Sequence, residues 1–194
     1  MTEDPFELFG QWYREAEQCK EIADASAVNL ATASPSGAPS SRMVLLKGFD
    51  QDGFVIFTNL KSRKGKELSK NGQAALCFYW APLARQVRIE GSVVPVNDEE
   101  ADQYFGSRPL KSRIGAWASR QSEPLESRTT LLKQVVIQTA RFAQGEVDRP
   151  AFWSGFRIVP DRMEYWTNGE YRLHDRIVYT RDMDGRWQHG LLYP

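Results

Sequence analysis

Apolar side chains recur at helical spacing near the start of the chain. Steps of three or four residues separate Phe6, Phe9, Tyr13 and Ala16. Asp4 precedes them as a suitable N-cap, Pro5 suits the first helical position, and Glu7 completes a capping box. The pattern therefore predicts an amphipathic helix over about residues 4–24.

The rest of the chain alternates short apolar runs with clusters of glycine, proline, asparagine and aspartate. Such runs are typical of strands in an antiparallel barrel or sandwich. We predict strands at 28–34, 40–49, 54–59, 73–81, 85–96, 152–168, 171–182 and 186–194. We predict further helices at 64–71, 97–107 and 123–145. The whole chain, residues 1–194, is thus expected to form one α+β domain around a mostly antiparallel barrel.

Composition narrows the classes of protein that fit this pattern. Apolar residues make up 41% of the 194 positions, which indicates a folded globular chain. The 25 basic residues balance 25 acidic ones, and this neutrality argues against nucleic acid as the main partner. No apolar run reaches the roughly 20 residues that a membrane helix needs.

With two cysteines and two histidines, the chain has few side chains of the types that most often bind transition metals. Cys19 and Cys77 are far apart and form no C-x-x-C pair, and no charged and apolar leader opens the chain. We therefore expect a protein of the reduced cytoplasm without a metal site. The common catalytic motifs G-x-S-x-G, H-E-x-x-H and G-x-G-x-x-G do not occur in a suitable context either.

Arginine and lysine are the chemically suggestive residues, because they lie among the predicted strands. The set comprises Arg42, Lys47, Arg63, Lys64, Arg85, Arg88, Arg108, Arg172 and Arg176. Arginine forks match phosphate oxygens well, so an anion is a natural ligand for part of this set. In isolation, however, a basic turn such as residues 58–64 is more often simply solvated.

The stretch YRLHDR, residues 171–176, contains one of the two histidines. In a strand, side chains alternate, and Arg172, His174 and Arg176 would lie on one face. Three such groups in a row repel one another unless solvent or an anion separates them. The pattern leaves a solvated polar face and a phosphate site equally open. A metal site is disfavoured, since no second ligand lies at suitable spacing.

Other polar residues give equally open signals. Arg42 and Lys47 bracket the apolar centre of the predicted strand 40–49. Strict alternation places them on opposite faces, so a shared ligand would require a bulge or separate contacts. Gln86 is suited to the polar edge of a heterocycle or to a partner across strands. Tryptophans are more often core or interface residues, here Trp117, Trp153 and Trp166. Taken separately, these signals indicate only an anion-binding barrel.

Six segments follow one another in an order that is specific in combination. They are SRMVLLKGFD (41–50), FTNLKSRKGKEL (57–68), RQVRIEGSV (85–93), YFGSRPLKSRIGAWASRQS (104–122), FWSGFRI (152–158) and YRLHDRIVY (171–179). Together they resemble the pyridoxamine 5'-phosphate oxidases, also called pyridoxine-phosphate oxidases. The resemblance covers nearly the whole chain from about Asp4 onward.

The resemblance implies an FMN-binding split β-barrel, antiparallel and Greek-key-like, with flanking helices. Such a protein forms a homodimer with FMN at the subunit interface. The implied reaction, in vitamin B6 metabolism, oxidises pyridoxamine or pyridoxine 5'-phosphate to pyridoxal 5'-phosphate. A hydride passes to flavin N5, and O2 reoxidises the flavin to give H2O2, with ammonia released from the amine.

The family's site residues carry over onto matching positions of this chain. The resemblance assigns cofactor binding to Arg42, Lys47, Phe57, Thr58, Arg63, Lys64, Gln86, Gln121, Ser122, Trp166 and Arg176. It assigns substrate binding to Lys47, Tyr104, Arg108, Ser112, Arg172 and His174. The expected catalytic pair is Arg172 and His174, with His174 orienting the substrate more than acting as an obligatory base.

Two features depart from the family pattern. Members commonly carry an N-terminal extension with an Arg-Tyr segment, whereas this chain opens almost directly at the predicted first helix. A lid formed by that extension is thus expected to be absent or supplied differently. The usual ending resembles Arg-Leu-x-Pro, but Leu191 stands where the arginine is expected. An anion contact of that arginine therefore does not carry over.

Three other functions compete with this interpretation. The first is a related split-barrel flavin oxidase of phenazine biosynthesis. Lys47 and the full RLHDR motif favour vitamin B6 metabolism instead, because phenazine-type relatives tend to lose parts of the phosphate-binding set. The second is a non-catalytic flavin- or haem-binding split-barrel protein. The third, a nucleic-acid-binding barrel, is disfavoured by the zero net charge. The sequence does not separate a preference for pyridoxine phosphate from one for pyridoxamine phosphate.

Overall fold

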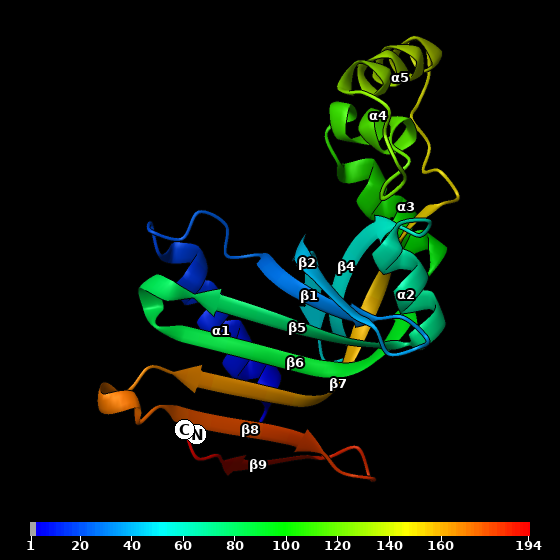
Figure 1. Cartoon of the computed structure of the whole chain (residues 1–194). Helices are drawn as coiled ribbons and strands as arrows, with labels where there is room; N and C mark the ends of the chain where they lie inside the picture. The colour runs from blue at the N-terminus through cyan, green and yellow to red at the C-terminus, as the bar shows by residue number, and fades with distance from the viewer. Residues whose placement is uncertain (1–2) are drawn as a thin grey trace.

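Nine strands form one curled antiparallel sheet in the computed structural model, which describes residues 3–194 (Figure 1). The strands are β1 Ala27–Ala33, β2 Pro39–Leu45, β3 Gly48–Asp50, β4 Gly53–Asn59, β5 Gln73–Trp80, β6 Arg85–Pro95, β7 Trp153–Thr167, β8 Asp175–Arg181 and β9 Trp187–Leu191. Hydrogen bonds join them in the order β2-β1-β5-β6-β7-β4-β3, and β8 and β9 extend the sheet from β7. Every neighbouring pair is antiparallel, as the sequence pattern predicts.

Strand β7 bends the sheet because different parts of it pair with different neighbours. Its first residues pair with β4 and its last with β8, while β6 runs along both parts. The register between β6 and β7 shifts between Glu90 and Gly91. A Cβ atom at Gly91 would lie 2.0 Å from the Val159 carbonyl oxygen, so the bulge requires glycine.

A main-chain contact links the two ends of the strand order. The Lys47 amide, between β2 and β3, donates a hydrogen bond to the Val55 carbonyl oxygen of β4 at 2.9 Å. The sheet is therefore curled into a half-barrel rather than lying open. The predicted fold class, an α+β antiparallel split barrel with flanking helices, is confirmed.

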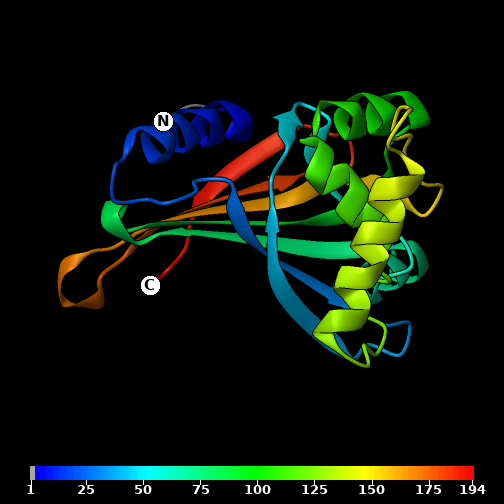
Figure 2. The same cartoon turned by 90° about the horizontal axis from the view of Figure 1, so that it is seen from above.

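Five α-helices flank the sheet within residues 3–194. They are α1 Pro5–Gln18, α2 Arg63–Asn71, α3 Asp98–Ser107, α4 Leu110–Ala118 and α5 Arg128–Arg141. Two short 3-10 turns are η1 Ala81–Leu83 and η2 Glu170–Arg172. Helix α1 lies against one face of the sheet, whereas α3, α4 and α5 gather at one end of it (Figures 1 and 2). None of the helices in this range is long and apolar enough to cross a membrane.

Helix α1 is attached to the sheet by aromatic side chains. Phe9 is fully buried, and its ring meets those of Phe54 and Phe78 edge-on, with centroids 4.9 and 5.3 Å away. The Tyr165 hydroxyl donates a hydrogen bond to the Pro5 carbonyl oxygen at 2.6 Å. Each fully buried ring of this kind contributes roughly 1.5–3 kcal/mol, so the apolar stripe is what holds the helix in place.

The first helix is shorter than its predicted range of 4–24. The predicted N-cap is confirmed, because the Asp4 carboxylate accepts a hydrogen bond from the Phe6 amide at 2.8 Å. The helix ends at Gln18, however, because Cys19 adopts an extended backbone with φ −77° and ψ 109°. The predicted end at residue 24 was wrong. Residues 19–24 are of types that helices accept, but they lie outside the helix.

Two further helices differ from the prediction, one unpredicted and one shorter than predicted. The prediction placed no helix at 110–118, where α4 lies, because Pro109 occupies the N-cap position and offers no side-chain hydrogen bond as a start signal. The helix predicted at 123–145 begins only at Arg128, behind the N-cap Ser127, and ends at Arg141. The helix predicted at 97–107 agrees closely with α3.

Candidate functional site

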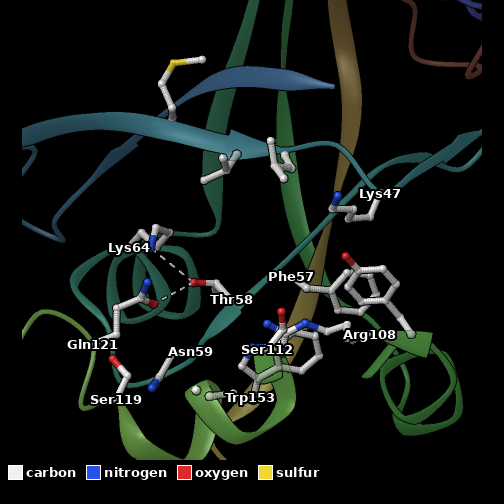
Figure 3. A pocket seen from close by; sticks show the side chains of 16 residues that line it. Lys47, Phe57, Thr58, Asn59, Lys64, Arg108, Ser112, Ser119, Gln121 and Trp153 are labelled. Atoms are coloured by element: carbon white, nitrogen blue, oxygen red, sulfur yellow. Dashed lines mark hydrogen bonds between the residues drawn. The ribbon is translucent and has the colours of Figure 1, made fainter. Parts of the chain in front are cut away.

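A cavity of about 410 Å³ lies where the ends of β2 and β4 face helices α3 and α4 (Figure 3). Its wall is formed by Met43, Val44, Leu45, Lys47, Phe57, Thr58, Asn59, Lys64, Tyr104, Arg108, Ser112, Gly115, Ala116, Ser119, Gln121 and Trp153. Among the described residues, no aspartate or glutamate lines it, whereas Lys47, Lys64 and Arg108 do. A cavity with three cations and no acid is electrostatically suited to an anionic ligand.

Arg108 is the best-defined cation of the cavity. Its guanidinium carbon lies 4.7 Å from the centroid of the Trp153 ring, and this cation–π contact holds the group against the aromatic wall. Atom Nη1 is buried and has no hydrogen-bond partner within residues 3–194. Burial lowers the pKa of Arg108, and the nearby Tyr104 hydroxyl opposes this only in part. A buried, unpaired guanidinium nitrogen beside a cavity is what a bound phosphate or carboxylate would satisfy.

Three aromatic rings form a stack beside Arg108. The Phe57 ring stacks on Tyr104 with a centroid distance of 4.2 Å and on Trp153 with 5.4 Å. Gly155, opposite Phe57 in β7, makes room for the stack, because a Cβ atom there would lie 2.7 Å from the Phe57 ring. The cavity therefore combines a flat apolar wall with cationic groups, which suits a planar ligand that carries an anion.

Lys64 marks a second polar region of the cavity (Figure 3). Its ammonium donates a hydrogen bond to the Thr58 hydroxyl at 3.3 Å, and that hydroxyl lies 3.4 Å from the Gln121 Oε1 atom. Burial lowers the pKa of Lys64, and the positive charge of Arg42 lowers it further. Two neighbouring cations that raise each other's free energy are stabilised when an anion binds between them.

Arg42 and Arg63, both expected at the cofactor, lie beside this region but not in the cavity wall. Arg42 donates to the Thr32 hydroxyl at 2.6 Å and lies 3.4 Å from the Glu67 carboxylate. Arg63, the first residue of α2, donates to Glu67 at 2.8 Å. Burial raises the pKa of Glu67, but hydrogen bonds from Ser40, Thr32 and Arg63 outweigh it and bring the pKa to about 2. Glu67 thus stays ionised and orients both arginines.

A second group of the expected residues lies on β6, β7 and β8, away from the cavity. Gln86, Trp166 and Arg176 face one another in register across these three strands. The His174 ring lies against Trp166, with centroids 4.7 Å apart. Arg172 belongs to the turn η2, which precedes β8. Figures 1 and 2 place this turn and the helices of the cavity at opposite ends of the sheet.

Residues 171–182 do not form the continuous strand that was predicted. Tyr171 and Arg172 have left-handed φ values of 55° and 66°, and β8 begins only at Asp175. Arg172, His174 and Arg176 therefore do not form one row on a strand face, and that prediction was wrong. The tight turn separates Arg172 from the strand and leaves only Arg176 in it.

Two remaining positions lie outside the cavity wall. Ser122 follows Gln121 in the loop after α4, with a positive φ of 70°. Leu191, the residue in place of the expected arginine, ends β9 opposite Ile177 and is 74% exposed. Its exposure shows that the apolar replacement is not part of the core.

Comparison with known proteins identifies the family. The family model described as pyridoxamine 5'-phosphate oxidase matches residues 15–140. A second model, described as the pyridoxine 5'-phosphate oxidase C-terminal dimerisation region, matches residues 153–194. The chain belongs to the pyridoxamine 5'-phosphate oxidase family. A pyridoxine/pyridoxamine 5'-phosphate oxidase from Rhizobium meliloti (strain 1021) is 56% identical over 192 residues, which cover 98% of this chain and 93% of the relative.

Solved structures show the same architecture. PhzG from Burkholderia lata 383, crystallised with tetrahydrophenazine-1-carboxylic acid, superposes with a TM-score of 0.93 at 31% identity, covering 100% of this chain and 94% of PhzG. A pyridoxamine 5'-phosphate oxidase-related, FMN binding protein from Nostoc punctiforme PCC 73102 superposes with a TM-score of 0.78 at 16% identity, covering 100% of both chains. The second likeness concerns the fold alone.

The structure also brings residues to the cavity of this oxidase family member that the sequence did not single out. They are Met43, Val44, Leu45, Asn59, Gly115, Ala116 and Ser119, and Trp153, which the sequence suggested as a core or interface residue, joins them. Four cavity residues, Ser112, Gly115, Ala116 and Ser119, occupy positions i, i+3, i+4 and i+7. This is the periodicity of one helix face, so recognising α4 in the sequence would have revealed them.

Proposed function

We propose that this chain is an FMN-dependent oxidase that converts pyridoxamine or pyridoxine 5'-phosphate to pyridoxal 5'-phosphate, with O2 as the electron acceptor. The observation that carries the proposal is the acid-free cavity, in which two cationic regions adjoin one aromatic wall. Two phosphate groups, one from the cofactor and one from the substrate, would account for two cationic regions. The 56% identity with the Rhizobium meliloti oxidase over nearly the full chain supports the same substrates.

The region around Lys64 is the proposed site of the FMN phosphate. Lys64 and Thr58 line it directly. Arg42 and Arg63 lie behind these residues, and each forms an ion pair with Glu67. Gln121 and Ser122 would contact the flavin from the end of α4. FMN, when bound, accepts the hydride from the substrate and passes two electrons to O2, giving H2O2.

The region around Arg108 is the proposed site of the substrate phosphate. Lys47, Tyr104 and Ser112 line the same part of the cavity, and the unpaired Nη1 atom of Arg108 supplies a free donor. Oxidation of the alcohol of pyridoxine phosphate yields the aldehyde directly. Oxidation of the amine of pyridoxamine phosphate also consumes water and releases ammonia. The protein's own contribution is to hold the reacting carbon against the flavin and to exclude other orientations.

A homodimer would unite the two groups of site residues. Gln86, Trp166, Arg172, His174 and Arg176 lie at the far end of the sheet from the cavity, so one chain alone leaves the predicted site divided. Four of these five fall within residues 153–194, the part that matches the dimerisation region of the family. A two-fold axis would place this group of one subunit over the cavity of the other.

Apolar side chains near the cavity support this arrangement. Met43 and Leu45, both in the cavity wall, are 61% and 41% exposed, and Tyr79 on β5 is 63% exposed. Exposed apolar residues that rim a polar pocket are typical of a protein interface. A partner subunit over these residues would bury them and would enclose the cofactor.

The competing function is a phenazine-type flavin oxidase, because the PhzG structure superposes so closely. Its co-crystallised acid carries a single carboxylate, as its name states, whereas the cluster of Lys47, Arg108, Tyr104 and Ser112 is richer in donors than one carboxylate needs. A non-catalytic flavin or haem protein is the other alternative, and the absorption spectrum of the purified protein separates these two cofactors.

The test measures flavin content and turnover on one preparation. We expect yellow protein that forms pyridoxal 5'-phosphate and H2O2 from both phosphorylated substrates. Lys64→Met should lower FMN affinity, whereas the control Lys61→Met should not, because Lys61 lies over the Phe152 ring outside the cavity wall. A protein that holds FMN tightly and turns over neither substrate would contradict the catalytic proposal.

A further inference from the structure

We propose, on the basis of the function proposed above, that the main-chain amide of Gly169 fixes His174 as the neutral tautomer with its proton on Nε2. His174 is then a hydrogen-bond donor to the substrate and not a proton acceptor. Gly169 is a positioning residue, because it acts on the substrate only through His174.

The geometry rests on one hydrogen bond. The Gly169 amide donates to His174 Nδ1 at 3.2 Å. A main-chain N–H group is a donor only, so Nδ1 has to present its lone pair. In neutral imidazole the single ring proton then resides on Nε2, because the partner of one ring nitrogen decides the state of the other.

The turn around this contact is tightly constrained. A Cβ atom at Gly169 would lie 1.9 Å from the Leu173 carbonyl oxygen, so no other residue fits without moving the turn. The Leu173 amide in turn donates to the Glu170 carbonyl oxygen at 3.0 Å. Within the same turn, Tyr171 and Arg172 keep left-handed φ values, which persist only where surrounding contacts impose them.

The Trp166 ring completes the support of the imidazole. It lies 4.7 Å from the His174 ring, centroid to centroid, at an interplanar angle of 46°. Trp166 pairs with Arg176 across β7 and β8, so the same strand pair carries two residues that are expected at the flavin. The contact with Trp166 therefore limits rotation of the His174 ring. The hydrogen bond from the Gly169 amide determines which ring nitrogen carries the proton.

This arrangement has a chemical consequence for the oxidation. A general base needs a free lone pair on the nitrogen that faces the substrate, but Nε2 carries the proton. His174 can therefore donate to an oxygen or nitrogen of the substrate and orient the reacting carbon. The proton that leaves the substrate's alcohol or amine passes to another acceptor and not to His174.

Nuclear magnetic resonance of the imidazole nitrogens tests the tautomer directly. The chain contains only His174 and His189, so protein labelled with ¹⁵N-histidine gives two sets of ring signals. The His189→Gln variant assigns them, because His189 lies on β9 and contacts the Tyr179 ring instead of the turn. We expect a protonated Nε2 and an unprotonated Nδ1 for His174. A proton on Nδ1 would overturn the proposal.

Two substitutions of His174 test the role in turnover. The side-chain amide of glutamine reaches the position of Nε2 and can donate there, whereas that of asparagine reaches only the position of Nδ1. We expect His174→Gln to keep kcat/KM within about 10-fold of wild type, and His174→Asn to lose about 100-fold, at equal flavin content. Equal losses in both variants would indicate a base and would overturn the proposal.

A third variant tests the positioning residue itself. Gly169→Ala should give mixed tautomer signals for His174 and lower kcat/KM by about 10-fold with bound flavin unchanged. Gly145→Ala is the matched control, because nothing lies within 4 Å of a Cβ atom there. Wild-type signals and turnover in Gly169→Ala would contradict the assignment. The tautomer is measured without substrate, so absence of any turnover in the wild type would reject the proposed function while leaving the tautomer result intact.

Discussion

Glu164 holds the side chain of Arg176 in one orientation. Its Oε1 atom accepts hydrogen bonds from Arg176 Nε at 3.0 Å and from Nη2 at 2.8 Å. Glu164 is only 2% exposed, and its other oxygen accepts from Arg162 at 3.0 Å. Arg176 Nη1 donates to the Tyr193 carbonyl oxygen at 2.8 Å, so the end of the chain completes the support. An arginine expected at the flavin is thus aligned before any ligand binds.

Replacing Glu164 by glutamine is expected to destabilise the protein and weaken FMN binding together. Burial raises the pKa of Glu164, but hydrogen bonds from Arg176 and Arg162 outweigh it and leave the group ionised. Removing that charge weakens the charge-assisted hydrogen bonds to the partly exposed Arg176 and Arg162, at a cost of about 2 kcal/mol in the free energy of unfolding. Urea denaturation and FMN titration measure the two effects. Glu90→Gln, which changes the more exposed acid of the same cluster, is the control.

The Glu164→Gln result also separates two roles of the ion pair. If Glu164 only stabilises the fold, the variant binds FMN with wild-type affinity once it is folded, and the positioning of Arg176 is refuted. If it aligns Arg176 for the flavin, affinity falls even under conditions where the variant is fully folded.

Arg108→Gln is expected to lower kcat/KM for the phosphorylated substrates by about 100-fold, because a charge-assisted hydrogen bond to phosphate is lost. The flavin content should stay at the wild-type level, since the FMN phosphate is proposed to bind at Lys64. Lys111→Gln removes an exposed positive charge from the first turn of α4, three residues after Arg108 and outside the cavity wall, and serves as the control. Steady-state kinetics with both substrates measures the effect, and an equal loss in both variants would argue against a specific phosphate contact.

Two inactive variants should complement each other if the site is shared between subunits. Arg108→Ala damages the cavity group and Arg172→Ala damages the turn group. Random exchange of subunits makes half of the dimers mixed, and each mixed dimer has one intact site, so about a quarter of wild-type activity should return. The measurement compares turnover before and after joint refolding of the two variants. Activity that stays at the level of the separate variants would contradict the shared site.

The stability of the protein in acid should depend on Glu67. Its pKa is lowered from 4.5 to about 2 in the folded protein, so its stabilisation is complete above about pH 4.5. Protonation removes this stabilisation as the pH falls toward 2. We expect Glu67→Gln to be less stable than wild type at pH 7 and the difference to shrink below pH 4.5. Denaturant titrations at several pH values test this, and a difference that is constant down to pH 2 would refute it.

Local signals in the sequence account for much of the fold. The Asp4 cap and the aromatic stripe through Phe9 predict the first helix, because capping and apolar spacing act within a few residues. Turn clusters also separate most of the strands for the same reason, but the single strand predicted at 40–49 is divided into β2 and β3, and the one predicted at 171–182 begins only at Asp175. The helix at 110–118 was missed because Pro109 gives no capping bond and its apolar residues partly face the cavity.

The site could be predicted only as a set of residues. The motifs identify Lys64, Arg108 and His174 as members, but they carry no information on which members share one cavity. The sequence also suggested a strand through Arg172, whereas the left-handed turn there results from contacts such as that between Gly169 and Leu173. Such contacts depend on the packing of the turn, which residue types alone do not specify.

The sequence by itself determined the antiparallel strands, most of the helices and the family, because these depend on local spacing and on ordered motifs. Only the tertiary structure decided that Lys64 and Arg108 share an acid-free cavity while His174 and Arg176 lie at the other end of the sheet. The physical reason is the curl of the sheet. The bulge at Gly91 and the pairing of β7 with both β4 and β8 set that curl, through contacts between residues far apart in the chain.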